Sequence, residues 1–147
     1  MTDNPVLFLD IDGVLNSTNF YIERNEKHEL DSRAVKWLSD LVNDIPNLDV
    51  VISSSYRKLH SLDEINQLLQ LYGATFTAID VTPNLNTFRG VEIQKWLSDN
   101  RNNNFKKYAI VDDDSDMMIW QQANFILTDG YWGLSPNHCY RIKRLFI

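Results

Sequence analysis

The chain of 147 residues has few of the features that mark secreted, membrane-bound or disordered proteins. A single cysteine, Cys139, excludes an internal disulfide and is typical of a reducing compartment. The five glycines and four prolines form no low-complexity tract or linker, and no internal repeat is present. No apolar run approaches the roughly 20 residues that span a bilayer, and residues 1–5 do not read as a signal peptide. These absences predict a soluble, cytoplasmic protein with no membrane partner.

Positive charge is also scarce, because 14 Lys and Arg stand against 20 Asp and Glu, for a net charge of -6. Non-specific binding along a nucleic-acid backbone needs a basic face, so this balance argues against it. Recognition of one phosphorylated end remains compatible with it. The length and the 44% hydrophobic content predict one domain over residues 1–147 with a substantial core. No pattern points to a protein partner or a homo-oligomer.

Apolar runs alternate with amphipathic segments along the chain. Strands are expected near residues 6–9, 48–52, 74–79, 108–111 and 125–127. Helices are expected at about 32–43, 61–73, 90–99, 118–120 and from 135 onward, whereas residues 17–29 read as a loop or a small hairpin. Such alternation predicts a three-layer α/β/α Rossmann-like domain with a mainly parallel sheet.

The most informative segment is Val-Leu-Phe-Leu-Asp-Ile-Asp-Gly-Val-Leu-Asn at residues 6–16. Its apolar run indicates a short buried strand that ends in Asp10 and Asp12. Gly13 lets the backbone turn sharply at the carboxyl edge of that strand. Asp-x-Asp-Gly also occurs in calcium loops, but Val14 stands where such a loop needs another polar ligand. Two carboxylates at a strand end therefore point to a hard cation such as Mg²⁺.

Two more expected strands end in polar residues. Ser53 and Ser54 follow the strand near 48–52, and Asp112, Asp113 and Asp116 follow the strand near 108–111. Because the carboxyl ends of parallel strands share one edge of the sheet, these side chains can converge with the first aspartate pair. The sequence therefore predicts a Mg²⁺ site there, with a serine hydroxyl available to a phosphate oxygen.

These motifs resemble those of the haloacid dehalogenase (HAD) superfamily of phosphohydrolases. Residues 8–15 match its first motif, residues 51–53 its second, and residues 110–113 with Asp116 its fourth. Ser-Ser-Ser-Tyr-Arg at 53–57, Arg-Gly-Val-Glu-Ile at 89–93 and Asp-Asp-Asp-Ser-Asp-Met at 112–117 are similar to a compact branch associated with RNA repair. That branch is related to the phosphatase domain of polynucleotide kinase-phosphatases. The resemblance implies an HAD-like phosphatase with Mg²⁺ as its cofactor.

The resemblance also implies roles for the first two motifs. Asp10 would be the nucleophile that forms an aspartyl-phosphate. Asp12 would protonate the leaving oxygen and then activate water, and its backbone carbonyl would bind Mg²⁺. Gly13 would support the turn. Ser53 would hold a phosphoryl oxygen, and Ser54 would do so if the strand ended one residue later.

The third motif requires a cation beside the nucleophile and the phosphate. Arg89, at the start of a helix, is the first choice, and Lys95, within that helix, is the alternative. Arg57 follows the serines closely, where it could contact substrate or form a surface salt bridge.

In the fourth motif, the register leaves two candidates open. Asp112 and Asp116 have the i, i+4 spacing of the family's aspartate pair, whereas the family's usual glycine-aspartate pattern aligns Asp113 as the metal ligand. Either residue would hold Mg²⁺ together with Asp10 and Asp12. Asp116 would support the site in both registers.

The intervals between the motifs are too short for a folded cap domain, so an open site is expected. An open site suits a bulky substrate, such as a phosphorylated nucleic-acid end, because a lid cannot close over one. Three hypotheses follow: a Mg²⁺-dependent phosphatase acting on nucleic-acid termini such as a 3′-phosphate, a phosphatase of small esters such as nucleotides, and a non-catalytic interaction module. The three histidines are interpreted as structural or surface residues and the tryptophans as core residues, with Tyr131 and Trp132, in a turn before Gly133, as the exception.

Overall fold

A computed structural model describes residues 2–24 and 30–147. Its centre is one sheet in which all five strands run parallel, in the order β3-β2-β1-β4-β5. The strands are β1 (Val6–Leu9), β2 (Asp49–Ile52), β3 (Asp80–Val81), β4 (Tyr108–Asp112) and β5 (Phe125–Leu127). All four residues of β1 are buried, as expected for the middle strand of a sheet covered on both faces.

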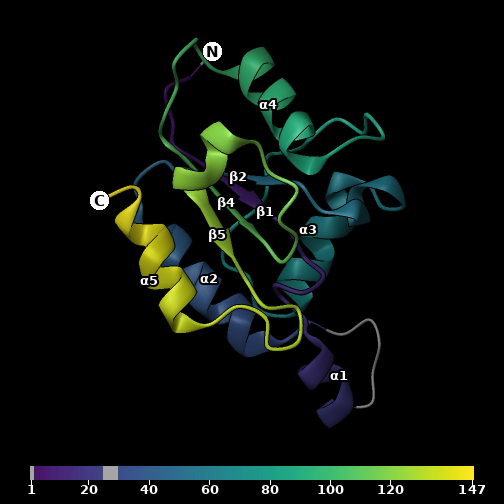
Figure 1. Ribbon diagram of the computed structural model, residues 1–147. Coiled ribbons are helices and arrows are strands. Elements are labelled where there is room, and N and C mark those ends of the chain that lie inside the picture. The colour runs from purple at the N-terminus through teal and green to yellow at the C-terminus, as the bar shows by residue number, and fades with distance from the viewer. Residues whose placement is uncertain (1, 25–29) are drawn as a thin grey trace.

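Helices cover both faces of this sheet (Figure 1). They are α1 (Thr18–Arg24), α2 (Ser32–Asp44), α3 (Leu62–Leu71), α4 (Arg89–Asn100) and α5 (Pro136–Arg144), with two 3₁₀ turns, η1 (Ser55–Lys58) and η2 (Ile119–Asn124). Alternate side chains of β1 enter two separate cores. Leu7 and Leu9 pack with α2, α3 and α5, whereas Phe8 packs with α4, where Trp96 meets its ring edge to face at 5.5 Å. The predicted three-layer α/β/α fold with a parallel sheet is confirmed.

Side chains cap three of the predicted helices. The side chain of Asp31 accepts a hydrogen bond from the Arg33 N–H at the start of α2. Ser61 and Glu64 form a reciprocal capping box at the start of α3, and Ser135 caps α5. Such caps satisfy N–H groups that a helix leaves unpaired, so they fix where each helix begins.

Two local predictions were wrong. Residues 18–24 form helix α1, started by the Ser17 hydroxyl accepting from the Phe20 N–H at 3.1 Å, rather than a loop or hairpin. Residues 25–29, with His28, lie outside the described residues. The third strand is Asp80–Val81 instead of 74–79, because the Asn66 side chain takes both the N–H and the carbonyl of Ala78. The short helix expected at 118–120 is present as the 3₁₀ helix η2, Ile119–Asn124.

The segments that could hold a cap domain contain only small elements. Within the described residues, α1 lies between β1 and α2, and η1, α3 and β3 lie between β2 and α4. The expected absence of a folded cap is therefore confirmed for this part of the chain. Among the same residues, no helix has the length and apolar character needed to cross a membrane.

Candidate active site

The loop after β1 depends on a close approach that only glycine permits. Gly13 has φ +79°, and a Cβ on it would lie 2.1 Å from Oδ2 of Asp113. A Cβ on Gly130 would lie 2.8 Å from the same oxygen. The Thr128 hydroxyl, just after β5, donates to the Gly13 carbonyl at 3.0 Å. Gly13, Gly130 and Thr128 thus allow the Asp113 carboxylate to lie against the loop after β1, which carries Asp12.

Three carboxylates meet at this edge of the sheet. One oxygen each from Asp10, Asp112 and Asp113 lies within 4.8 Å of the others. Asp10 and Asp112 are buried at the ends of β1 and β4, whereas Asp113 is exposed. Carboxylate oxygens grouped in this way form a donor set that suits a hard divalent cation such as Mg²⁺.

A guanidinium lies beside two of these carboxylates. Nη1 of Arg89, the first residue of α4, contacts Oδ2 of Asp112 and lies 3.3 Å from Oδ1 of Asp10. Lys95 instead pairs with Asp99 at 2.9 Å on an exposed part of α4. The structure therefore brings Arg89 to the site and leaves Lys95 outside it.

The electrostatics of the cluster also favour a cation. Burial and the neighbouring Asp112 raise the pKa of Asp10 to about 9, although Arg89 opposes the shift. Burial likewise raises the pKa of Asp112. Burial alone would lower the pKa of Arg89, but the charges of Asp10 and Asp112 outweigh it and raise that pKa. One guanidinium is too little positive charge for three carboxylates, so the site fits an added divalent ion.

The two candidate ligands of the fourth motif differ in how their oxygens are used. Oδ1 of Asp112 accepts from the Asp114 N–H at 2.9 Å, and its Oδ2 accepts from Arg89. Asp113 is exposed and lines the cleft described below. The donor set therefore favours Asp113 as the metal ligand and Asp112 as the partner of Arg89.

The serines after β2 have different surroundings. The Ser53 N–H donates to the Leu9 carbonyl at 3.0 Å, which ties it to the end of β1. Its hydroxyl is buried and has no hydrogen-bond partner in the described part of the chain. The Ser54 hydroxyl accepts from the Tyr56 N–H at 3.2 Å and caps η1. The Ser53 hydroxyl is therefore the less engaged of the two and the better candidate to donate to a phosphoryl oxygen.

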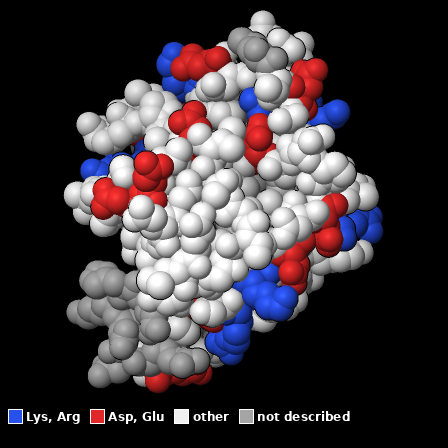
Figure 2. All heavy atoms as spheres, turned by 180° about the vertical axis from the view of Figure 1, so that it is seen from behind, with Lys and Arg blue, Asp and Glu red and all other residues white. Residues whose placement is uncertain are grey.

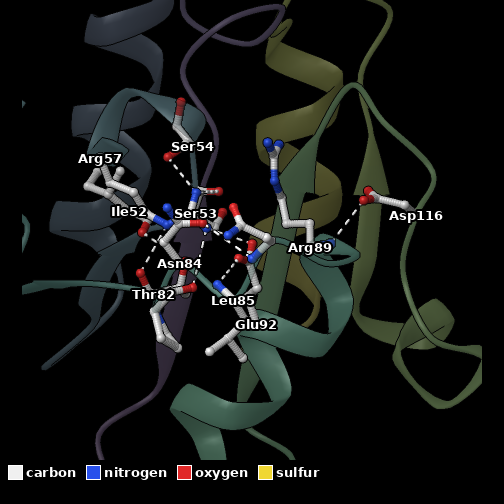
Figure 3. Close-up of polar contacts among 12 residues, drawn as sticks. Ile52, Ser53, Ser54, Arg57, Thr82, Asn84, Leu85, Arg89, Glu92 and Asp116 are labelled. Atoms are coloured by element: carbon white, nitrogen blue, oxygen red, sulfur yellow. Dashed lines mark hydrogen bonds and ion pairs between the residues drawn. The ribbon is translucent and has the colours of Figure 1, made fainter. Parts of the chain in front are cut away.

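Arg57 is buried and does not face the cleft, contrary to the expectation that it contacts substrate or forms a surface salt bridge. Its side chain is 2% exposed and pairs with Glu92 of α4 at 2.6 Å. Its other N–H groups donate to four backbone carbonyls, those of Ser53, Ser54, Thr82 and Pro83. Figure 3 shows this guanidinium between the segment after β2 and the first turns of α4. Arg57 therefore joins the Ser53 segment to the helix that carries Arg89.

Asp116 fixes the start of α4. Its Oδ2 accepts from the Arg89 N–H at 2.9 Å (Figure 3). Its carbonyl accepts from the Gly90 N–H at 3.2 Å. Phe88 stands at the N-cap position and makes no side-chain cap. Asp116 thus replaces a local cap and positions Arg89, a more specific role than the supporting one predicted for it.

Asp12 is held at the rim of the site. Its Oδ1 accepts from Nδ2 of Asn16 at 2.9 Å, while Oδ1 of Asn16 accepts from the Gly13 N–H at 3.0 Å. Asp12 and Asp113 line a cleft of about 660 Å³ that continues along α1 and η1. An exposed, oriented carboxylate beside a buried one is an arrangement suited to general acid–base chemistry.

Sequence reasoning missed Asn16, Thr128 and Glu92. Asn16 directly follows the first motif, and its position at the end of the turn was a signal for an Asx-type contact. Glu92 lies between two apolar residues of α4, a sign of a buried, paired carboxylate. No local pattern marks Thr128, because its contact with Gly13 spans 115 residues.

The comparison with protein families agrees with this geometry. One family profile, described as "HAD domain in Swiss Army Knife RNA repair proteins", matches residues 6–139. No curated protein and no solved structure matches the chain. The match includes every residue of the cluster around Asp10 and supports a phosphohydrolase of the HAD type in general. On this evidence, the chain belongs to the family of HAD domains found in Swiss Army Knife RNA repair proteins.

Proposed function

We propose that the chain is a Mg²⁺-dependent phosphomonoesterase that acts through an aspartyl-phosphate on Asp10. The observation that carries this proposal is the meeting of Asp10, Asp112 and Asp113 beside the Arg89 guanidinium. The buried, unpartnered hydroxyl of Ser53 adds a donor after the neighbouring strand. Carboxylate nucleophile, cation and hydroxyl donor are the groups that phosphoryl transfer requires.

The reaction proceeds in two displacements. A carboxylate oxygen of Asp10 attacks phosphorus, the bond from phosphorus to the leaving oxygen breaks, and Asp12 gives that oxygen a proton. Asp12 then takes a proton from water as the water oxygen attacks phosphorus. The bond from phosphorus to Asp10 breaks, and inorganic phosphate is released. Arg89 balances charge on the phosphoryl oxygens, and Ser53 donates a hydrogen bond to one of them.

Asp10, Asp113 and the backbone carbonyl of Asp12 would hold the Mg²⁺. The bound ion supplies positive charge that favours the ionised form of Asp10 and offsets charge on the phosphoryl group. It thereby counters the effect of burial, which otherwise keeps the Asp10 carboxyl protonated near neutral pH.

The substrate class that the observations favour is a phosphorylated nucleic-acid end, such as a 3′-phosphate. The family description names RNA repair, and no folded cap covers the site within the described residues. On the face seen in Figure 2, basic side chains alternate with acidic ones and form no continuous basic track. A terminus, held by its phosphate, suits such a surface better than the length of a strand.

The test is phosphate release from a panel of 3′-phosphorylated oligonucleotides, nucleotides and sugar phosphates, with Mg²⁺ or EDTA. We expect turnover with Mg²⁺, none with EDTA, and a loss of at least about 10³-fold in Asp10→Asn, because an amide is a poor nucleophile. Asp114→Asn is the matched control, since Asp114 lies in the same acidic loop and its exposed side chain is outside the carboxylate cluster.

Other outcomes separate the alternatives. Preference for free nucleotides over oligonucleotide ends would identify a small-ester phosphatase. Absence of phosphate release from every substrate, including an aryl phosphate, would favour a non-catalytic module and contradict the proposal.

A further inference from the structure

A cleft of about 660 Å³ opens beside Asp12, and the chemistry proposed above uses only the end of it that Asp12 and Asp113 line. Residues of the loops after β1 and β4, of α1 and of η1 line it. The lining side chains that bear on its ligand are those of Asp12, Tyr21, Tyr56, His60 and Asp113. The volume falls within the range of about 300–1,000 Å³ that small-molecule sites occupy.

Three aromatic side chains, Tyr21, Tyr56 and His60, line the cleft. The rings of Tyr56 and His60 stack with their centroids 5.3 Å apart and 28° between their planes. Tyr21 contributes a second phenol from α1. Burial raises the pKa of Tyr21 and of Tyr56, and the charge of Asp12 raises both further, so the two phenols lie near that carboxylate. Flat apolar surfaces therefore flank the residue that would protonate the leaving oxygen.

The charges of the cleft restrict what it can hold. None of its described lining residues is Lys or Arg, and the carboxylates present are those of Asp12 and Asp113. Away from the Mg²⁺ that Asp113 would hold, a leaving group with further phosphates inside the cleft would find no Lys or Arg of the lining to balance its charge. The cleft therefore suits a leaving group that is uncharged and planar.

We propose that this cleft is a subsite for the nucleoside next to the scissile phosphate, with its base stacked on Tyr56 or Tyr21. The inference rests on the proposed function and specifies its leaving group. A base offers a flat, uncharged face to a tyrosine ring, and such stacking does not depend on which base is present. The ligand of the cleft is thus one nucleoside. It can belong to a free nucleotide or to the end of a strand whose remaining phosphates lie outside the cleft.

The first experiment compares kcat/KM for adenosine 3′-phosphate and ribose 3-phosphate, which differ by the base. Because stacking on a tyrosine changes affinity by about tenfold or more, we expect the nucleotide to be preferred by about tenfold. Tyr56→Ala should remove much of this preference by raising KM for the nucleotide alone. Tyr56→Phe should restore it, since the ring is retained. Tyr140→Ala is the control, because Tyr140 is an exposed tyrosine of α5 outside the cleft.

A 3′-phosphorylated dinucleotide distinguishes the two sources of the nucleoside. If its kcat/KM equals or exceeds that of the mononucleotide, the ligand is a strand end, and if it is tenfold lower, the ligand is a free nucleotide. Both results support the subsite.

Failure of the subsite and failure of the proposed function give different results. Equal kcat/KM for adenosine 3′-phosphate and ribose 3-phosphate, unchanged by Tyr56→Ala and Tyr21→Ala, would overturn the subsite and leave the phosphatase intact. If neither ester is hydrolysed, calorimetric titration of Asp10→Asn with adenosine 3′-phosphate in Mg²⁺ still tests the subsite. Adding Tyr56→Ala should then weaken binding about tenfold, and unchanged affinity would overturn it.

Discussion

The buried ion pair between Arg57 and Glu92 makes Glu92→Gln a sharp test of how the site is held together. The two side chains are 2% and 5% exposed, and Nη2 of Arg57 lies 2.6 Å from Oε1 of Glu92. Glutamine has nearly the same shape and its amide oxygen can still accept from the Leu85 N–H, which now donates to Oε2 at 2.8 Å. The substitution therefore removes one charge, turns an amide NH₂ toward Nη2 of Arg57 and leaves the guanidinium buried without a counter-ion.

Breaking a buried pair by removing one charge destabilises a protein by about 3–5 kcal/mol. Four backbone carbonyls continue to accept from Arg57, so we expect the lower end, about 3 kcal/mol. The same variant should lower kcat/KM, because Arg57 connects the Ser53 segment to the helix that positions Arg89.

Urea unfolding followed by circular dichroism measures this loss as a lower midpoint with an unchanged slope. The matched control is Asp99→Asn, which breaks the exposed Lys95–Asp99 pair on the same helix. An exposed i, i+4 pair contributes about 0.3–0.5 kcal/mol, so the control should be nearly neutral. A loss below about 1 kcal/mol in Glu92→Gln would refute the reasoning, since it would mean that the buried charge of Arg57 needs no partner.

Three other predictions concern the carboxyl edge of the sheet. In EDTA, the free energy of unfolding should fall as pH rises from about 4 to about 9. Folding raises the pKa of Asp10 from 3.8 to about 9, so the folded state holds a proton in this range that the unfolded state has lost. Asp10→Asn should flatten that dependence in unfolding curves at pH 5 and pH 8, and an identical slope would contradict the shift. Asp116→Ala should lower the free energy of unfolding by about 1 kcal/mol and reduce kcat/KM, because it releases Arg89. Asp116→Asn keeps an acceptor oxygen and should retain most of the stability and most of the activity. Equal effects of the two variants would argue against capping. Gly13→Ala should destabilise the protein by more than about 1 kcal/mol, because the φ of +79° and the nearby Asp113 carboxylate exclude a Cβ. A thermal midpoint equal to that of the wild type would show that the loop can move aside.

The sequence predicted the parts of the fold whose signals are local. An apolar run that stops at Asp10 places the central strand, because few other structures bury four consecutive apolar residues and end in paired carboxylates. The caps at Asp31, Ser61 and Ser135 are short-range contacts, so the residues beside them indicate where three helices begin.

Contacts between distant segments could not be predicted in this way. The Arg57 side chain is buried because its partners Thr82 and Glu92, 25 and 35 residues away, surround it once β2, β3 and α4 have assembled. The third strand begins late because the Asn66 side chain competes for the backbone of Ala78. Tertiary competition of this kind overrides local preference.

The same distinction holds for the candidate site. Asp10, Asp112 and Asp113 were predicted to converge because strand ends in a parallel sheet share one edge. The separate surroundings of Asp112 and Asp113 follow from the Arg89 contact, which depends on where α4 begins. Asp116 sets that start from 27 residues away, and no sequence pattern next to Arg89 reveals it.

The most direct test of the central claim is to look for the covalent intermediate. A reaction of the Mg²⁺-loaded protein with a phosphate monoester, quenched in acid after a few turnovers, can be digested and mapped by mass spectrometry. The account predicts a phosphoryl group on the peptide that contains Asp10, absent when EDTA is added first and absent in Asp10→Asn. Turnover that persists in Asp10→Asn, or a phosphoryl group on another residue, would contradict it.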